Sequence, residues 1–93
     1  MGAFNPRGRW YPEGMGESGI VVRLFAGLEQ VARGAGAERR LAAAEAPHVG
    51  AVVERLGLQG RAGLILVNGV HAGTDRALAP GDEVDLFPPV GGG

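Results

Sequence analysis

Residues 81–93 read GDEVDLFPPVGGG, and this stretch combines a turn, a strand and an unusual tail. Apolar side chains alternate with others over residues 84–87, the period of two that is typical of a strand with one buried face. Pro88 and Pro89 cannot donate hydrogen bonds to a sheet, and each fixes φ at about −65°. The pair therefore ends the strand and leaves the chain stiff and extended. Beyond Val90 there is only glycine.

Two turns precede this strand. Residues 64–68 read LILVN, a short apolar run that ends at Asn68-Gly69, the pair that most strongly indicates a two-residue type I′ hairpin. The return strand is expected to begin at Val70-His71. A second turn is predicted at Pro80-Gly81, just before the final strand.

The N-terminal half of the domain predicts one strand and two helices. Residues 20–25 read IVVRLF, a run rich in β-branched residues that favours a strand. A short helix is expected after it, with Leu28, Val31 and Ala32 at helical spacing and a stop at Gly34. Residues 47–57 form the clearest helix, because their apolar residues recur at i, i+3, i+4 and i+7 before a glycine cap.

Composition favours one small soluble domain without a catalytic cavity. The 93 residues are 45% hydrophobic and 20% charged, and a chain this short buries a modest core. A net charge of −1 gives no general attraction to nucleic acid or to anionic membranes. No membrane span or signal peptide is recognisable, so we expect a cytoplasmic protein.

Cysteine and lysine are both absent. Without cysteine there is no disulfide framework, no thiolate nucleophile and no cysteine metal site, and two histidines alone do not predict a metal centre. The absence of lysine is explained either by compositional bias or by avoidance of amines near a reactive C-terminal acyl group.

Residues 1–18 resemble a flexible leader in their glycine, proline and charge, yet they hold three of the five aromatic residues. The stretch RGRWY at residues 7–11 could stack on nucleic-acid bases, although the signal is weak. We therefore expect a leader that is flexible, or that docks its aromatic side chains on the domain or on a partner.

These motifs together resemble the MoaD/ThiS sulfur-carrier family, most of all the small subunit of molybdopterin synthase. The resemblance covers residues 20–93 and is strongest over the turn, strand, double proline and terminal glycines of residues 81–93. It implies an α+β fold of the ubiquitin-like β-grasp type, with a mixed sheet packed on a helix. The division expected is a leader at 1–18, a domain at 19–87 and a tail at 88–93.

The same resemblance decides one ambiguous segment. Residues 37–46 read AERRLAAAEA, and all four residue types are good helix formers. The family fold instead requires a second strand here, paired with residues 20–25. We predict the strand, because tertiary pairing can override local propensity.

In this family, sulfur is carried as a thiocarboxylate on the last glycine, which implies that role for Gly93. A terminal carboxyl group is ionised at neutral pH and is a poor electrophile, so it must first be activated. The resemblance implies an adenylyltransferase partner, similar to ubiquitin-activating enzymes, that consumes ATP and magnesium. A sulfur donor and a synthase large subunit are the other implied partners. No cofactor is expected on the chain itself.

The partner-binding residues implied by this role follow the last strand. Phe87 is the candidate anchor because alternation turns it away from the core, although it could instead pack on the leader aromatics. Pro88 and Pro89 stiffen the base of the tail, and Val90 would contact the entrance of a partner pocket or serve as a spacer. The remaining candidates are Gly91 and Gly92, since residues without Cβ allow close approach of surrounding backbone.

Other polar residues are expected to be structural. His48 and His71 are expected at the surface, and Asp82 with Glu83 is expected to serve turn chemistry rather than acid-base catalysis. Two other functions remain open. The chain could be a ubiquitin-like modifier that is conjugated through Gly93 to lysines of other proteins, or an interaction module whose tail is incidental.

Overall fold

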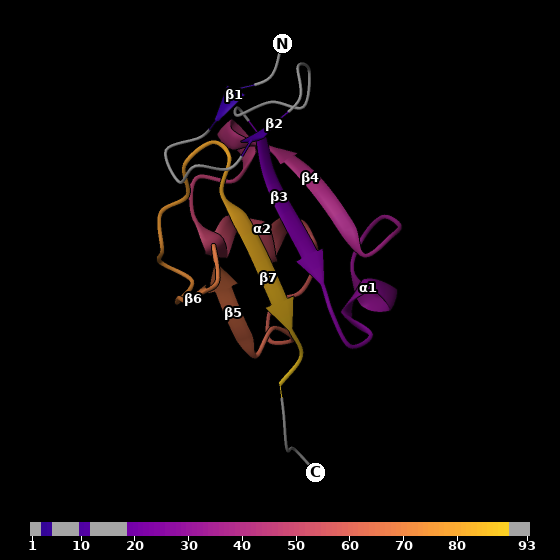
Figure 1. Cartoon of the computed structure of the whole chain (residues 1–93). Coiled ribbons are helices and arrows are strands. Elements are labelled where there is room, and N and C mark those ends of the chain that lie inside the picture. The colour runs from indigo at the N-terminus through magenta and orange to yellow at the C-terminus, as the bar shows by residue number, and fades with distance from the viewer. Residues whose placement is uncertain (1–2, 5–9, 12–18, 90–93) are drawn as a thin grey trace.

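The computed structural model describes residues 3–4, 10–11 and 19–89 of the chain. Five strands form one sheet of order β4-β3-β7-β5-β6, and two further strands, β1 and β2, pair with each other (Figure 1). The elements in chain order are β1 (Ala3–Phe4), β2 (Trp10–Tyr11), β3 (Gly19–Leu24), α1 (Leu28–Val31), β4 (Glu38–Ala42), the 3₁₀ turn η1 (Ala43–Glu45), α2 (Val49–Arg55), β5 (Leu64–Val67), β6 (Val70–His71) and β7 (Glu83–Phe87).

The sheet is mixed. Its two central strands, β3 and β7, are parallel, whereas the β3–β4, β5–β7 and β5–β6 pairs are antiparallel. Helix α2 lies across one face of this sheet (Figure 1). The predicted α+β class and the β-grasp arrangement of a mixed sheet on a helix are therefore confirmed.

The core lies between α2 and the inner face of the sheet. Strand β3 alternates half-buried and buried residues along its whole length, as the period of two predicts. In α2 the residues at helical spacing are buried and the helix is followed by Gly57 at φ +71°, which confirms the predicted glycine cap. The fully buried side chains of largest volume are Ile20, Val22, Val49, Val52, Leu58, Val67, Val84 and Leu86.

The segment that favoured a helix by propensity is a strand, as predicted. Strand β4 pairs antiparallel with β3, and the pairing sets Leu41 against Ile20 and lets it pack on the core. The alanine-rich residues that follow form only one 3₁₀ turn, η1. Packing of Leu41 and the ladder to β3 thus outweigh the local preference.

Helix α1 is a single turn, shorter than its spacing suggested. Leu28 and Ala32 are buried, but Val31 is exposed. The loop that follows is held by Arg39, whose guanidinium donates to the carbonyl of Gly36 at 2.6 Å and to that of Arg33. Arg39 is therefore a half-buried structural residue, whereas Arg40 is exposed.

The two predicted turns are locked together by side chains. Asn68 and Gly69 have φ values of +52° and +82°, the positive values that a type I′ hairpin requires at both positions. The Asn68 amide donates to Asp82 Oδ1 at 3.0 Å, and its own oxygen accepts from the backbone N–H of Glu83 at 3.1 Å. Asp82 Oδ2 accepts from the N–H of Ala79 at 2.9 Å, which confirms the structural role expected for Asp82.

The leader lies mainly outside the described residues. Its described part is the backbone pairing of Ala3 with Tyr11 and of Phe4 with Trp10, so its expected flexibility or docking stays a prediction. Strand β3 begins at Gly19 and β7 ends at Phe87. The division into leader, domain and tail likewise remains a prediction.

Replacement of Asp82 by alanine should destabilise the domain. Asp82 is 3% exposed and accepts two hydrogen bonds, so its loss leaves the partly buried Asn68 amide and Ala79 N–H without their acceptor. We expect about 1–3 kcal/mol of lost unfolding free energy, seen as a lower urea midpoint. Asp75→Ala, at an exposed aspartate, is the matched control and should change stability by less than about 0.5 kcal/mol. Equal midpoints for the two variants would contradict the proposed lock.

Candidate functional site

The aromatic candidate Phe87 lies beside a second phenylalanine. Phe25 directly follows β3 and Phe87 ends β7, and the N–H of Phe25 donates to the carbonyl of Leu86 at 3.0 Å. The two rings stack with centroids 4.6 Å apart and an angle of 9° between their planes. Parallel pairing of the central strands thus brings together two rings that are far apart in sequence.

These rings lie on the outer face of the sheet, opposite α2. Leu24 and Leu86 are buried on the inner face, so the next residue of each chain turns outward. Leu64 lies directly across from Phe87 in the antiparallel β5–β7 pair and is 41% exposed. Phe25, Leu64 and Phe87 together form what we call the aromatic patch.

The structure corrects the expected exposure of Phe87. Its ring was expected to stand free as an anchor, but it is half-buried by stacking on Phe25, and Phe25 is the more exposed ring at 37%. The alternative contact of Phe87 with the leader aromatics falls on side chains outside the described residues. The candidate anchor is therefore a stacked pair of rings rather than a single ring.

Charged residues share the rest of this outer face with the half-buried Val21 and Leu66. Arg23 Nη1 lies 3.0 Å from Glu83 Oε1, and Arg23 Nε lies 3.8 Å from Glu38 Oε1. The Glu83 side chain is only 11% exposed, which makes its pair with Arg23 the more shielded of the two. Asp85, between Glu83 and Phe87 on the same face, keeps one buried oxygen, Oδ1, without a hydrogen bond to any described residue. Along β7 itself, the outward residues thus change from charged, at Glu83 and Asp85, to aromatic at Phe87.

The tail base directly follows the patch. Strand β7 ends at Phe87, whose carbonyl accepts a final hydrogen bond from the N–H of Gly63 at 2.7 Å. Pro88 is half-buried and Pro89 is exposed. The proline pair ends the strand as predicted.

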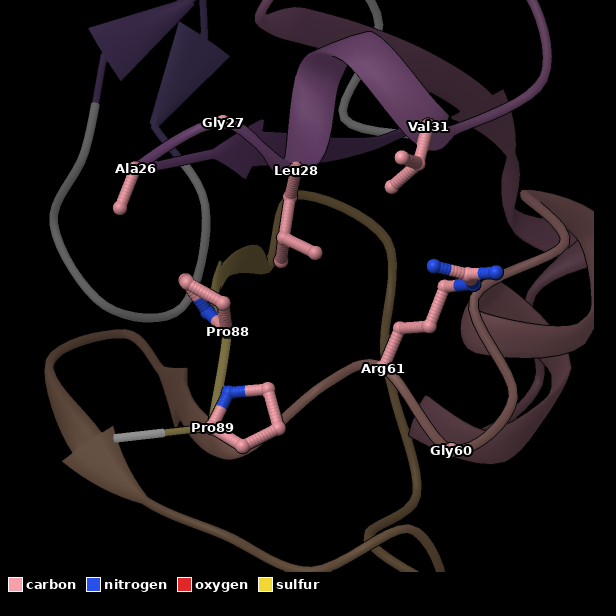
Figure 2. Close-up of a pocket in the computed structure, with 8 residues that line it drawn as sticks. All are labelled: Ala26, Gly27, Leu28, Val31, Gly60, Arg61, Pro88 and Pro89. Atoms are coloured by element: carbon pink, nitrogen blue, oxygen red, sulfur yellow. The ribbon is translucent and has the colours of Figure 1, made fainter. Parts of the chain in front are cut away.

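A groove of about 380 Å³ borders the tail base on the side of α1. In Figure 2, Leu28, Val31 and the exposed Arg61 face this space from one side, and the rings of Pro88 and Pro89 border the other. Pro88 and Pro89 thus border this groove and directly follow Phe87 of the aromatic patch.

The other candidates are partly outside the described residues. Val90, Gly91, Gly92 and Gly93 are among the undescribed positions, so their predicted roles are untested. His48 and His71 are both exposed, as expected, and lie away from the tail base at the start of α2 and in β6.

The described residues offer neither a metal centre nor a membrane-spanning helix. No group of three or more histidine, cysteine, aspartate or glutamate side chains there is arranged to hold a metal ion. In the same ranges, no helix has both the length and the apolar character that crossing a membrane demands.

Several residues near the tail base were not predicted as site residues from the sequence. Phe25 and Leu64 could have been found, because strand alternation places both on the outward side of their chains. Val31 and Arg61 carry no such signal, since their proximity to the prolines depends on the path of two loops.

Comparisons with known proteins agree with this geometry. A model of the ThiS family matches residues 22–93. The structure of Haloferax volcanii SAMP1, a small archaeal modifier protein, is 31% identical with a TM-score of 0.60, over 81% of this chain and 99% of that one. A Pyrococcus furiosus protein assigned as molybdopterin converting factor subunit 1 is 26% identical with a TM-score of 0.59, over 77% and 98%.

A more distant structure shows the shared fold alone. Urm1 from Trypanosoma brucei is 21% identical with a TM-score of 0.60, over 82% of this chain and 96% of that one. No curated protein matches the sequence. Because the family model spans residues 22–93, from the second half of β3 through the tail, the chain belongs to the ThiS family of ubiquitin-like carrier proteins.

Proposed function

We propose that this protein is a sulfur carrier whose Gly93 carboxyl group is converted to a thiocarboxylate. The observation that carries the proposal is the stiff tail base: in a ThiS-family chain, Pro88 and Pro89 leave the sheet beside an exposed aromatic patch. The acceptor pathway proposed is molybdopterin synthesis, with this chain as the small subunit of a cytoplasmic synthase. Similarity to the Pyrococcus furiosus protein supports that choice.

The proposed chemistry begins at the terminal carboxylate. An oxygen of Gly93 attacks the α-phosphate of ATP in an activating enzyme, pyrophosphate leaves, and the carboxyl group becomes a good electrophile as its adenylate. A persulfide sulfur then displaces AMP, and a thiol reduces the resulting acyl disulfide to the thiocarboxylate. The chain has no cysteine, so it offers no thiol for holding this sulfur elsewhere.

The rigid domain supplies the grip for this reaction. Aromatic residues are enriched among the residues that dominate binding energy, and Phe25 is stacked in place before a partner arrives. Less conformational entropy is then lost on docking than for a freely rotating side chain. We therefore assign the aromatic patch to the activating enzyme and to the synthase large subunit.

A second candidate function is protein modification through Gly93. It is favoured by the 31% identity to the Haloferax volcanii modifier protein over most of both chains. Both functions share the adenylate, and they differ in whether sulfur or a lysine amine displaces AMP. A lysine-free chain could not form polymers of itself through isopeptide bonds.

Loading with sulfur should be visible in the intact mass. Incubation with the activating enzyme, ATP, magnesium and a persulfide donor should raise the mass by one exchange of oxygen for sulfur. A variant that lacks Gly92 and Gly93 is the control and should keep its mass. An unchanged full chain, in a reaction that converts an established carrier, rules out the sulfur-carrier function. If the lysines of other proteins instead carry a remnant of this chain's C-terminal glycines, the protein-modifier function is supported.

Removal of the exposed ring of the patch should weaken docking. We expect Phe25→Ala to raise the Kd for the activating enzyme about tenfold, because a central aromatic residue contributes about 1.4 kcal/mol or more. Val70→Ala, at a 61% exposed residue of β6, is the control and should bind normally. Titration calorimetry measures both, and circular dichroism checks folding. If Phe25→Ala binds as tightly as Val70→Ala, the patch is not the docking surface.

A further inference from the structure

Gly63 lies against the base of the tail. It immediately precedes β5, and the register that sets Leu64 across from Phe87 places Gly63 across from Pro88. Its N–H donates to the carbonyl of Phe87 at 2.7 Å, which closes the ladder between the two strands. The chain that leaves β7 therefore passes directly over this glycine.

The approach is close enough to exclude any side chain. A Cβ atom at position 63 would lie 2.7 Å from the nitrogen of Pro89 and 3.0 Å from the carbonyl carbon of Pro88, and closer still to the Cα of Pro89. All three are backbone atoms, which cannot rotate out of the way as a flexible side chain can. A larger residue here must displace the tail base or the start of β5.

Backbone conformation does not explain this glycine. Gly27, Gly60 and Gly69 have positive φ values with open space around the Cβ position, so those glycines serve their turns. Gly63 has no positive φ, and an alanine could adopt its backbone angles. What position 63 requires is space for the proline pair.

The proline pair has little freedom to absorb a displacement. Each proline has a fixed φ, and Phe87 just before them is held by the stack on Phe25 and by the hydrogen bond to Gly63. A methyl group at position 63 would therefore change the direction in which the chain leaves Pro89. The stacked pair of Phe25 and Phe87, on the outer face, is expected to stay in place.

We propose that Gly63 is a positioning residue that aims the reactive tail. It acts through Pro88 and Pro89, by letting their backbone lie in contact with the sheet at a set angle to the aromatic patch. A partner that binds the patch then meets Pro88 and Pro89, the base of the tail, at one orientation. This role rests on the proposed adenylation of Gly93. Under this proposal the aromatic patch determines docking, and Gly63 affects only how the Gly93 carboxyl group is placed in the partner.

The test compares Gly63→Ala with Gly73→Ala in the full chain. Gly73 also lacks a positive φ, and a Cβ there would approach only the side chain of Asp75, at 3.2 Å. With the activating enzyme, we expect Gly63→Ala to lower kcat for pyrophosphate formation about tenfold or more, because small misplacements of a reacting group are costly. Its Kd for the enzyme should stay within about twofold of the control.

A double variant tests whether the effect passes through the prolines. Pro89→Gly frees φ at the point of contact, so in the Gly63→Ala background it should restore part of the lost kcat. If the fold-loss of kcat in the double variant equals the product of the fold-losses in the two single variants, the two positions act independently, and this contradicts the proposal. So would a kcat for Gly63→Ala equal to that of Gly73→Ala, or a loss of kcat that tracks a collapsed unfolding midpoint.

A structural measurement separates this proposal from the proposed function. In nuclear magnetic resonance spectra, the native chain should show a cross-peak between the Hα protons of Gly63 and Pro89. Gly63→Ala should shift the resonances of Pro88 and Pro89 and leave those of Phe25 nearly unchanged. Unshifted proline resonances overturn the positioning role even if adenylation occurs. If the proline resonances shift but the native chain is never adenylated, the positioning role of Gly63 is supported and the proposed function is wrong.

Discussion

Strands β3 and β7 come from opposite ends of the domain and pair in parallel at the centre of the sheet. This contact sets Val22 beside Val84 and Leu24 beside Leu86 on the inner face, where α2 covers them. One residue further along, the same register brings Phe25 and Phe87 together on the outer face. It also places Pro88 directly beyond the end of the central strand β7. The core, the aromatic patch and the tail base are consequences of one strand pairing.

The two faces of the sheet differ in how much free energy their side chains contribute to folding. Each fully buried valine or leucine contributes about 1.5–3 kcal/mol, and the largest fully buried side chains all belong to the core. A stacked aromatic pair adds about 0.5–1.5 kcal/mol beyond its buried area. The fold therefore depends chiefly on the inner face. The half-exposed rings are free to contribute their remaining apolar surface to a partner.

Much of this architecture could be predicted from the sequence, because several signals there are local. The Asn68-Gly69 hairpin, the glycine after α2 and the proline end of β7 each follow from the backbone chemistry of one or two residues. Strand β4 could not be predicted from its own residues, since its pairing with β3 outweighs a helical composition. Gly63 and Arg61 were missed because their importance arises where separate segments meet, and no periodicity marks such a meeting.

In the proposed function, the rigid domain docks on the partner and the tail reacts. The most direct test of this division adds a chain that ends at Pro89 to the activating enzyme together with the full chain. Release of pyrophosphate measures the activation of the full chain. The shortened chain should inhibit competitively, because it keeps the aromatic patch, and it should release no pyrophosphate itself. If it fails to inhibit at concentrations well above the KM of the full chain, or is itself adenylated, the division between docking body and reacting tail is wrong.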